Sequence, residues 1–128
     1  MGTVQYMSPE QAAGRPVDYR SDQFSFGSIL YEMATGAIAF ARETGPETQA
    51  AVMRDEPDPI TLVNPHVPGQ LVRLIKRCLE KDPGDRYDST RDLARELDSL
   101  GEPRTSGPSS KRFLLTIAAG IGLMGMVV

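Results

Sequence analysis

The sequence predicts an all-helical fold. In three segments, apolar residues recur at the three- and four-residue spacing of an amphipathic helix, and a glycine or a proline follows each segment. No segment shows the strict alternation of apolar and polar residues that is typical of a half-buried strand. With 128 residues, of which 40% are apolar and 24% charged, the chain can form one modest packed domain.

Charge and composition argue against several classes of protein. The formal net charge of -3 provides no broad basic field, so we expect no nucleic-acid partner. A single cysteine excludes an internal disulfide. Cys78 and His66 alone are too few ligands for a structural zinc site, which normally takes four, so we predict no metal site.

The first two predicted helices begin at serine residues. Ser8-Pro9-Glu10-Gln11 combines a serine cap, a proline at the first helical position and a glutamine that can bond back, and Gly14 ends this short helix. Ser21 is the expected cap of a second helix, which ends at Gly36. The apolar residues on the stripe of this second helix are Phe26, Ile29, Leu30, Met33 and Ala34, and those off it are Phe24 and Tyr31. This distribution predicts a central helix that is buried on most sides.

Three more helices follow, separated by long loops at residues 37–45 and 57–68. Residues 47–56 form a weaker helix that stops before Pro57. The next has an apolar face of Leu71, Leu74, Ile75, Cys78 and Leu79, ends at Asp82-Pro83, and makes Cys78 a small buried hydrophobe. The last begins at Ser89, carries Leu93, Ala94, Leu97 and Leu100, and ends at Gly101. His66 is expected to be a loop residue.

The C-terminal part has a different composition. Residues 101–112 are rich in Gly, Pro and Ser, which predicts a flexible linker. Residues 113–128 hold 12 apolar side chains, three Gly and one Thr. As a helix they would be about 24 Å long, short of the roughly 30 Å hydrocarbon core, so we expect a transmembrane segment truncated by the end of the chain. A buried core helix is the alternative. Arg104, Lys111 and Arg112 precede the segment and predict a single-pass membrane protein with residues 1–112 in the cytoplasm.

Four motifs occur in a characteristic order. They are Gly-Thr-Val-Gln-Tyr-Met-Ser-Pro-Glu at residues 2–10, Asp-Tyr-Arg-Ser-Asp-Gln-Phe-Ser-Phe-Gly at 18–27, Leu-Tyr-Glu-Met-Ala-Thr-Gly at 30–36 and Cys-Leu-Glu-Lys-Asp-Pro-Gly-Asp-Arg-Tyr at 78–87. This ordered set resembles the large lobe of bacterial serine/threonine protein kinases. The resemblance implies that residues 1–100 form the helical C-terminal subdomain of a protein-kinase-like fold.

The resemblance also implies roles for single residues. Gly2, Thr3 and Tyr6 fall in the family's substrate-docking loop. Ser8, Pro9 and Glu10 match its Ala-Pro-Glu element, whose glutamate pairs with an arginine that corresponds to Arg86. Asp22 matches an aspartate that accepts hydrogen bonds from the catalytic-loop backbone, and Gly27 belongs to the same structural motif. Without the resemblance, Glu10 and Asp22 would be solvated acids in a first helical turn, and Thr3 a polar residue near a terminus.

The groups that perform phosphoryl transfer in this family have no counterpart in the sequence. There is no His-Arg-Asp loop, no Asp-Phe-Gly motif and no Val-Ala-Ile-Lys strand. Residues 120–127 fit the pattern of a glycine-rich phosphate loop, but no lysine follows them. We therefore predict no catalytic residue and no ATP or Mg²⁺ site in this chain, although the full-length family uses both.

The resulting hypothesis is a fragment of a membrane-anchored serine/threonine kinase that keeps the docking loop and lacks the ATP site. Its expected partners are protein substrates, the missing half of the kinase and the membrane. The alternative is a non-catalytic, membrane-tethered interaction module, a pseudokinase-like scaffold.

Overall fold

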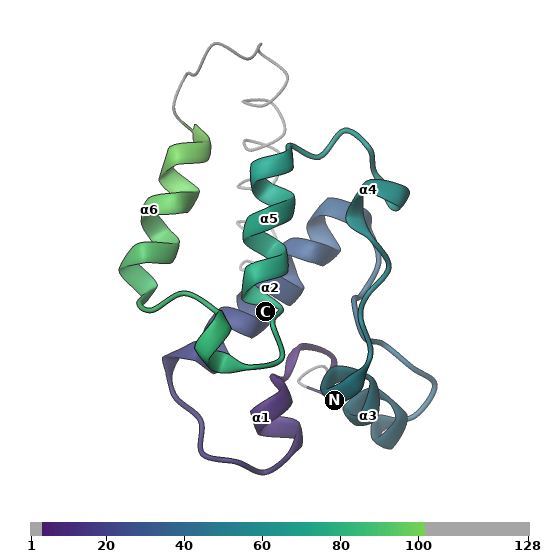
Figure 1. Cartoon of the computed structure of the whole chain (residues 1–128). Coiled ribbons are helices and arrows are strands. Elements are labelled where there is room, and N and C mark those ends of the chain that lie inside the picture. Colours follow the sequence, from purple (N-terminus) through teal and green to yellow (C-terminus); the bar gives the residue numbers. More distant parts are fainter. Residues whose placement is uncertain (1–3, 102–128) are drawn as a thin grey trace, which may run out of the picture.

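The computed structural model describes residues 4–101, and within this range it contains helices and no strands (Figure 1). The all-helical prediction is therefore confirmed for this part of the chain. The elements in order are the 3₁₀ helix η1 (Val4–Tyr6), α1 (Pro9–Ala12), α2 (Tyr19–Thr35), α3 (Gly45–Arg54), α4 (Ile60–Val63), α5 (Gly69–Cys78), the 3₁₀ helix η2 (Pro83–Asp85) and α6 (Thr90–Gly101).

The predicted linker and membrane segment, apart from Gly101 at the end of α6, lie outside the described residues. None of the helices within residues 4–101 combines the length and the hydropathy needed to cross a bilayer.

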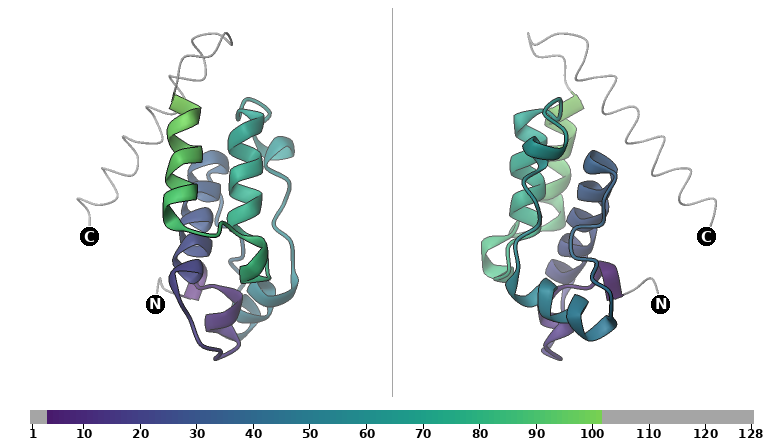
Figure 2. Two further views of the ribbon diagram at one scale, coloured as in Figure 1. Left: turned by 60° about the vertical axis from the view of Figure 1, so that its left-hand side comes forward. Right: turned by 90° about the vertical axis from the view of Figure 1, so that its right-hand side faces the viewer.

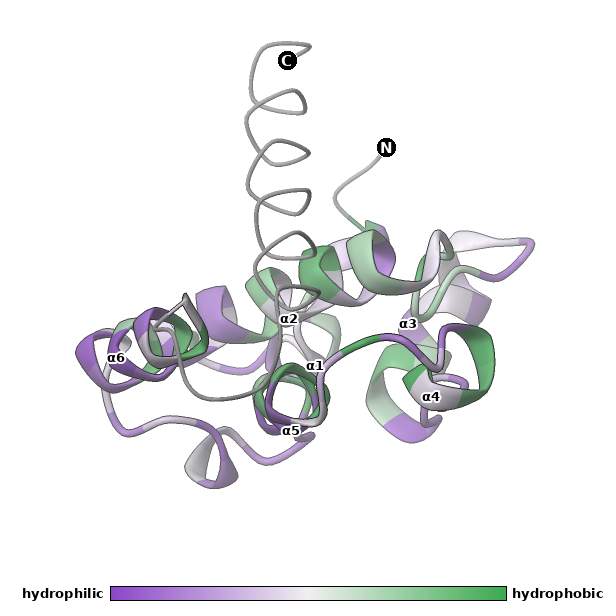
Figure 3. Ribbon diagram, turned by 90° about the horizontal axis from the view of Figure 1, so that it is seen from above, coloured by the Kyte–Doolittle hydropathy of each residue, from purple (hydrophilic) through white to green (hydrophobic). Residues whose placement is uncertain are grey.

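Helix α2 is the centre of the arrangement. It packs against α5, and α5 in turn packs against α6. In Figure 1, α5 stands between α6 on one side and α4 on the other, and α1 and α3 lie together at one end of α2 (Figures 1 and 2). Seen from above, α6 turns a largely hydrophilic side outward (Figure 3).

Local capping explains where the helices begin. Ser8 and Gln11 form both hydrogen bonds of the expected capping box at α1. The predicted start of α2 at Ser21 is wrong, because the carboxylate of Asp18 accepts a hydrogen bond from the backbone of Arg20 (2.9 Å) and begins the helix three residues earlier. Ser21 instead turns its hydroxyl into the interior.

The other helix bounds differ from the predictions in detail. Thr44 caps α3, which begins at Gly45 and ends at Arg54, each bound two residues before the predicted one. Helix α4 lies within the segment that we expected to be a loop. Helix α5 ends at Cys78 rather than at Asp82, which instead caps η2 by accepting from the backbone of Gly84 (2.8 Å). His66 is exposed in the loop before α5.

Helix α2 is buried on most sides, as predicted. On its apolar stripe, Leu30 and Ala34 are 2% and 3% exposed, and Phe26, Ile29 and Met33 are half-buried. Off the stripe, Phe24 and Tyr31 are 0% and 3% exposed. The reason is tertiary: the ring of Phe24 stacks on that of Phe40, with centroids 5.7 Å apart, and the ring of Tyr31 packs toward the segment before α4. The residues that line the core are Phe24, Leu30, Tyr31, Ala34, Phe40, Val52, Leu71, Leu74, Ile75, Cys78 and Leu79.

Gly27 sets how closely α2 and α5 approach. A Cβ atom added at Gly27 would lie 2.6 Å from the Cβ of Cys78 and 3.3 Å from the Cδ2 of Leu79. Because the Cβ of Cys78 is fixed to its backbone, alanine at position 27 would force the two helices apart. Cys78 is fully buried, as predicted, and this burial raises the pKa of its thiol to about 12, so the thiol is unreactive at neutral pH.

Candidate functional site

A buried ion pair joins the N-terminal motif to the loop after α5. The guanidinium of Arg86 donates to both carboxylate oxygens of Glu10, from Nη1 to Oε2 at 2.7 Å and from Nη2 to Oε1 at 2.9 Å. Arg86 is 1% exposed and Glu10 is 7% exposed. The pairing implied by the resemblance is therefore present, and it has the two parallel bonds that only an arginine fork can make with a carboxylate. The alternative of a solvated acid at Glu10 is wrong.

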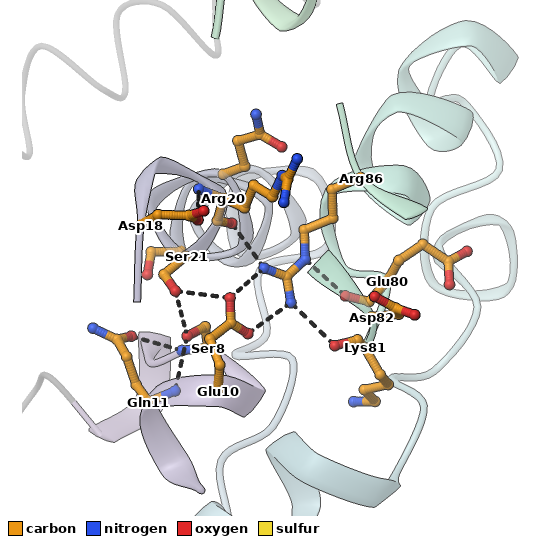
Figure 4. A network of polar contacts seen from close by, with 12 residues as sticks. Ser8, Glu10, Gln11, Asp18, Arg20, Ser21, Glu80, Lys81, Asp82 and Arg86 are labelled. Carbon is orange, nitrogen blue, oxygen red and sulfur yellow. Dashed lines mark hydrogen bonds and ion pairs between the residues drawn. The ribbon is translucent and has the colours of Figure 1, made fainter. Parts of the chain in front are cut away.

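Every N–H group of the guanidinium has an acceptor (Figure 4). The three bonds that do not go to Glu10 reach backbone carbonyls: Nε donates to Glu80 at 2.8 Å, Nη1 to Arg20 at 2.8 Å and Nη2 to Lys81 at 3.3 Å. A guanidinium has five N–H donors, and all five are used. Arg86 thereby ties α1, the first turn of α2 and the segment after α5 to one point.

Hydroxyl groups extend this network toward the start of α1. Ser21 donates to Oε2 of Glu10 at 2.7 Å, and the hydroxyl of Ser8 donates to that of Ser21 at 3.1 Å. The hydroxyl of Ser8 also accepts from the backbone N–H of Gln11 at 3.2 Å, so the cap of α1 belongs to the same chain of contacts (Figure 4). Pro9, at the first turn of α1, is buried beside them.

The network changes the acidity of Glu10. Burial alone would raise the pKa of this carboxyl group, but hydrogen bonds from Arg86 and Ser21 outweigh burial and lower it from 4.5 to about 2. Glu10 is therefore a carboxylate across the physiological range, and the pair stays charged on both sides.

Sequence reasoning missed a second buried contact to the same loop. The side-chain amide of Gln23 donates to the carbonyl of Tyr87 and accepts from its backbone N–H, both at 3.1 Å. The guanidinium of Arg77 lies over the ring of Tyr87, 4.3 Å from its centroid. The sequence carried no signal for this contact, because Gln23 is one of several polar residues in α2.

The segment before α1 is fixed to α2 at Tyr6. The phenol of Tyr6 donates to the carboxylate of Glu32, and the hydroxyl of Ser25 donates to the backbone carbonyl of Tyr6 at 2.7 Å. The hydrogen bond to Glu32 raises the pKa of Tyr6 to about 12. Neither Ser25 nor Glu32 was singled out from the sequence. Gly2 and Thr3, predicted for the same loop, lie outside the described residues.

Asp22 stands apart from this network. It is exposed in the first turn of α2, at the edge of an apolar groove of about 250 Å³ between α2 and α6. The other residues along this groove are Gln23, Phe26, Thr90, Leu93, Ala94 and Leu97. Within residues 4–101, no group of three or more His, Cys, Asp or Glu side chains is placed to hold a metal ion.

Comparison with known proteins agrees with this geometry. Residues 1–96 match the protein kinase domain. The chain belongs to the protein kinase family. A probable serine/threonine-protein kinase of Clostridium acetobutylicum is 39% identical over 100 residues, which cover 78% of this chain and 15% of that protein. The serine/threonine-protein kinase PknB of Mycobacterium tuberculosis is 32% identical over 126 residues, which cover 94% of this chain and 20% of PknB.

A solved structure shows the same arrangement of helices. The twitchin kinase region of C. elegans aligns with a TM-score of 0.70 at 22% identity, covering 94% of this chain and 22% of that one. At this identity the likeness concerns the fold, which is that of one part of a kinase domain. The chain spans about a fifth or less of each of these three proteins.

A double-mutant cycle tests the strength of the buried pair. Arg86→Lys and Glu10→Gln should each lower the free energy of unfolding by about 3 to 5 kcal/mol, because each leaves buried polar groups without partners. The double variant should lose less than the sum of the two. The sequence has no Trp, so the measurement is urea unfolding of the full chain in mild detergent, followed by far-UV circular dichroism.

The matched controls for this cycle are Arg95→Lys and Asp98→Asn on the exposed side of α6, each expected to cost about 0 to 1 kcal/mol. Strictly additive losses at positions 10 and 86 would contradict an energetic coupling between them.

The lowered pKa of Glu10 predicts a pH dependence. Because the pKa of about 2 in the folded chain lies below the ordinary 4.5, the pair stabilises the fold fully above pH 4.5, and this stability is lost as the pH falls toward 2. This shift of the Glu10 pKa corresponds to a contribution of about 3 kcal/mol to the free energy of unfolding. The difference in unfolding free energy between the wild type and Glu10→Gln should therefore shrink from pH 5 to pH 2. A constant difference over this range would show that Glu10 titrates normally.

Proposed function

We propose that this chain is the substrate-docking part of the large lobe of a serine/threonine protein kinase. The observation that carries the proposal is the buried Glu10–Arg86 pair, because it fixes the end of the loop matched to substrate docking onto the rest of the lobe. In this role the chain positions a protein Ser or Thr. It does not itself activate ATP.

The docking loop is held from two sides. Tyr6 contacts Ser25 and Glu32 on α2, and Ser8 contacts Ser21 at the start of the same helix. A loop fixed at both points can present its backbone to a substrate without paying a large ordering cost on binding. Thr3 would then contact the catalytic apparatus, as the resemblance implies.

Phosphoryl transfer itself requires groups that the 128 residues do not contain. It depends on positioning and on charge stabilisation by a phosphate-binding lysine, a catalytic aspartate and Mg²⁺ ligands. We infer that ATP and Mg²⁺ bind to those groups in another part of the kinase, and that this chain supplies no ligand to either.

The groove between α2 and α6 is our candidate for the contact with that other part. Asp22 at its edge is exposed and is placed to accept hydrogen bonds from a neighbouring backbone, the role that the resemblance implies. Phe26 and Leu97 beside it are half-buried apolar side chains, which a further packed element would cover.

Reconstitution in two pieces tests this function. The purified chain with Mg-ATP should show neither autophosphorylation nor a thermal shift. Adding the segment of the Clostridium acetobutylicum kinase that precedes its match to this chain should restore phosphorylation of casein. Asp22→Asn should lower the restored rate by roughly 10- to 100-fold, the value of hydrogen bonds to a charged group. The exposed Asp98→Asn is the matched control and should leave the rate unchanged.

Three other outcomes of the reconstitution would each count against part of this proposal. Phosphorylation by the chain alone would contradict the absence of an ATP site. Binding of the added segment without any phosphorylation would favour the non-catalytic interaction module, which the missing motifs also allow. Failure to bind at all would contradict the proposed groove.

We also propose that residues 113–128 anchor the protein in a membrane, with residues 1–112 in the cytoplasm. The support is compositional: the segment has no charged residue, and Arg104, Lys111 and Arg112 precede it. Each leucine or isoleucine near the centre of such a segment favours insertion by roughly 0.3 to 0.6 kcal/mol.

Fractionation of cells tests the anchor. The full chain should remain in the membrane pellet after high-salt and alkaline carbonate washes, because apolar insertion resists both. Removing residues 113–128 should release it, whereas removing residues 102–112 instead should not. Recovery of the full chain in the supernatant would refute the anchor.

A further inference from the structure

A second hollow lies on the other side of α5 from the groove. It is a pocket of about 440 Å³ between α2, α5 and the chain that leads into α4. Its floor is apolar and buried, and its rim carries charged side chains. The floor residues are Tyr31, Ile60, Ile75 and Leu79, the rim residues are Glu56, Asp58, Lys76 and Glu80, and Pro57 and Pro59 complete the lining.

The walls of this pocket are already fixed in place. The phenol of Tyr31 donates to the backbone carbonyl of Asp58 at 2.8 Å, which holds the segment before α4 against α2. Pro57 and Pro59 flank this contact and restrict the backbone on both sides. Ile60 and Ile75 are 3% and 0% exposed, so the floor is part of the core. A ligand would therefore meet a preformed surface, and little conformational entropy would be lost on binding.

The charge on the rim selects the kind of ligand. Glu56, Asp58 and Glu80 are exposed carboxylates, and Lys76 is the single ammonium among the lining residues. Within the part of the chain that the structure describes, the ion pairs are those of Arg42 with Asp55 and of Arg86 with Glu10, so none of the rim carboxylates is held in an ion pair. Lys81 is close enough to Glu56 for a Coulombic interaction, whereas Asp58 and Glu80 have no such contact with Lys81. An apolar group that carries positive charge beside it complements both the floor and the rim.

We propose that this pocket, defined by Tyr31, Ile60, Ile75, Leu79 and the acidic rim, binds an extended segment of a partner protein in which an apolar side chain is flanked by lysine or arginine. The apolar side chain enters the floor, and the basic side chains lie against Glu56, Asp58 and Glu80. The pocket and the groove at Asp22 share no lining residue, and α5 stands between α4 and α6 (Figure 1). The proposal therefore does not depend on the reconstitution described above.

Methyl NMR with a defined peptide tests the pocket. The probe is the acetylated, amidated peptide Gly-Lys-Leu-Arg-Gly, added to the full chain labelled at its isoleucine methyl groups in mild detergent. The methyl signals of Ile60 and Ile75 should shift and saturate, with half-saturation below about 1 mM. Ile29 and Ile38 lie outside the pocket lining and should not move. The matched peptide Gly-Glu-Leu-Glu-Gly should cause no shift.

Charge variants provide the second measurement. Glu56→Gln/Glu80→Gln should weaken binding about three- to tenfold, the range expected when two exposed charge pairs are lost. Glu43→Gln/Glu47→Gln removes the same charge from exposed positions outside the pocket and should leave binding unchanged. Higher salt should weaken binding to the wild type more than to the pocket variant.

Three results would overturn the proposal. The first is the absence of shifts at Ile60 and Ile75 at millimolar peptide. The second is equal binding of the acidic peptide, which would show that the rim does not select charge. The third is movement of the same two signals when the chain is concentrated without peptide, which would make a second copy of the chain the occupant.

Discussion

The buried guanidinium of Arg86 holds three separate elements of this fold together. A charge removed from water is tolerated only where its partner and its remaining hydrogen bonds are all supplied, and here one carboxylate and three backbone carbonyls supply them. Because these acceptors come from α1, from α2 and from the segment after α5, satisfying one side chain fixes the relative positions of three elements. Removing either charge would leave the other without its partner.

Helix α2 connects the ion-pair network to the segment before α1. Its first turns carry Ser21, which enters the ion-pair network, and Gln23, which holds the chain at Tyr87. Further along, Ser25 and Glu32 hold Tyr6. The same helix packs on α5 at Gly27, where only a glycine leaves room for Cys78. A helix that makes this many polar contacts cannot shift against its neighbours without breaking several of them, a property that the proposed docking role requires.

The two hollows of the described unit have different chemistry and lie on opposite sides of α5. The groove beside α6 is almost wholly apolar and has one exposed carboxylate, Asp22, at its edge, so it suits a packed element of the same kinase. The pocket toward α4 has an apolar floor beneath an acidic rim, which suits reversible binding of a basic segment. In our two proposals, the groove serves assembly of the domain and the pocket serves recognition of a partner.

The sequence alone was enough to predict the helical class, the caps at Ser8 and Ser89, the place of Cys78 in the core and, through its motifs, the pairing of Glu10 with Arg86. Periodicity and capping act over three or four residues, so they can be read locally. Tertiary contacts set the start of α2, the contact of Glu32 with Tyr6 and the pocket before α4. The predicted start of α2 was wrong because Ser21 donates its hydroxyl to Glu10 in α1, and Asp18 caps the helix instead. The carbonyls that complete the shell of Arg86 carry no signature in the sequence, since every residue has one, and only folding selects which of them meet the guanidinium.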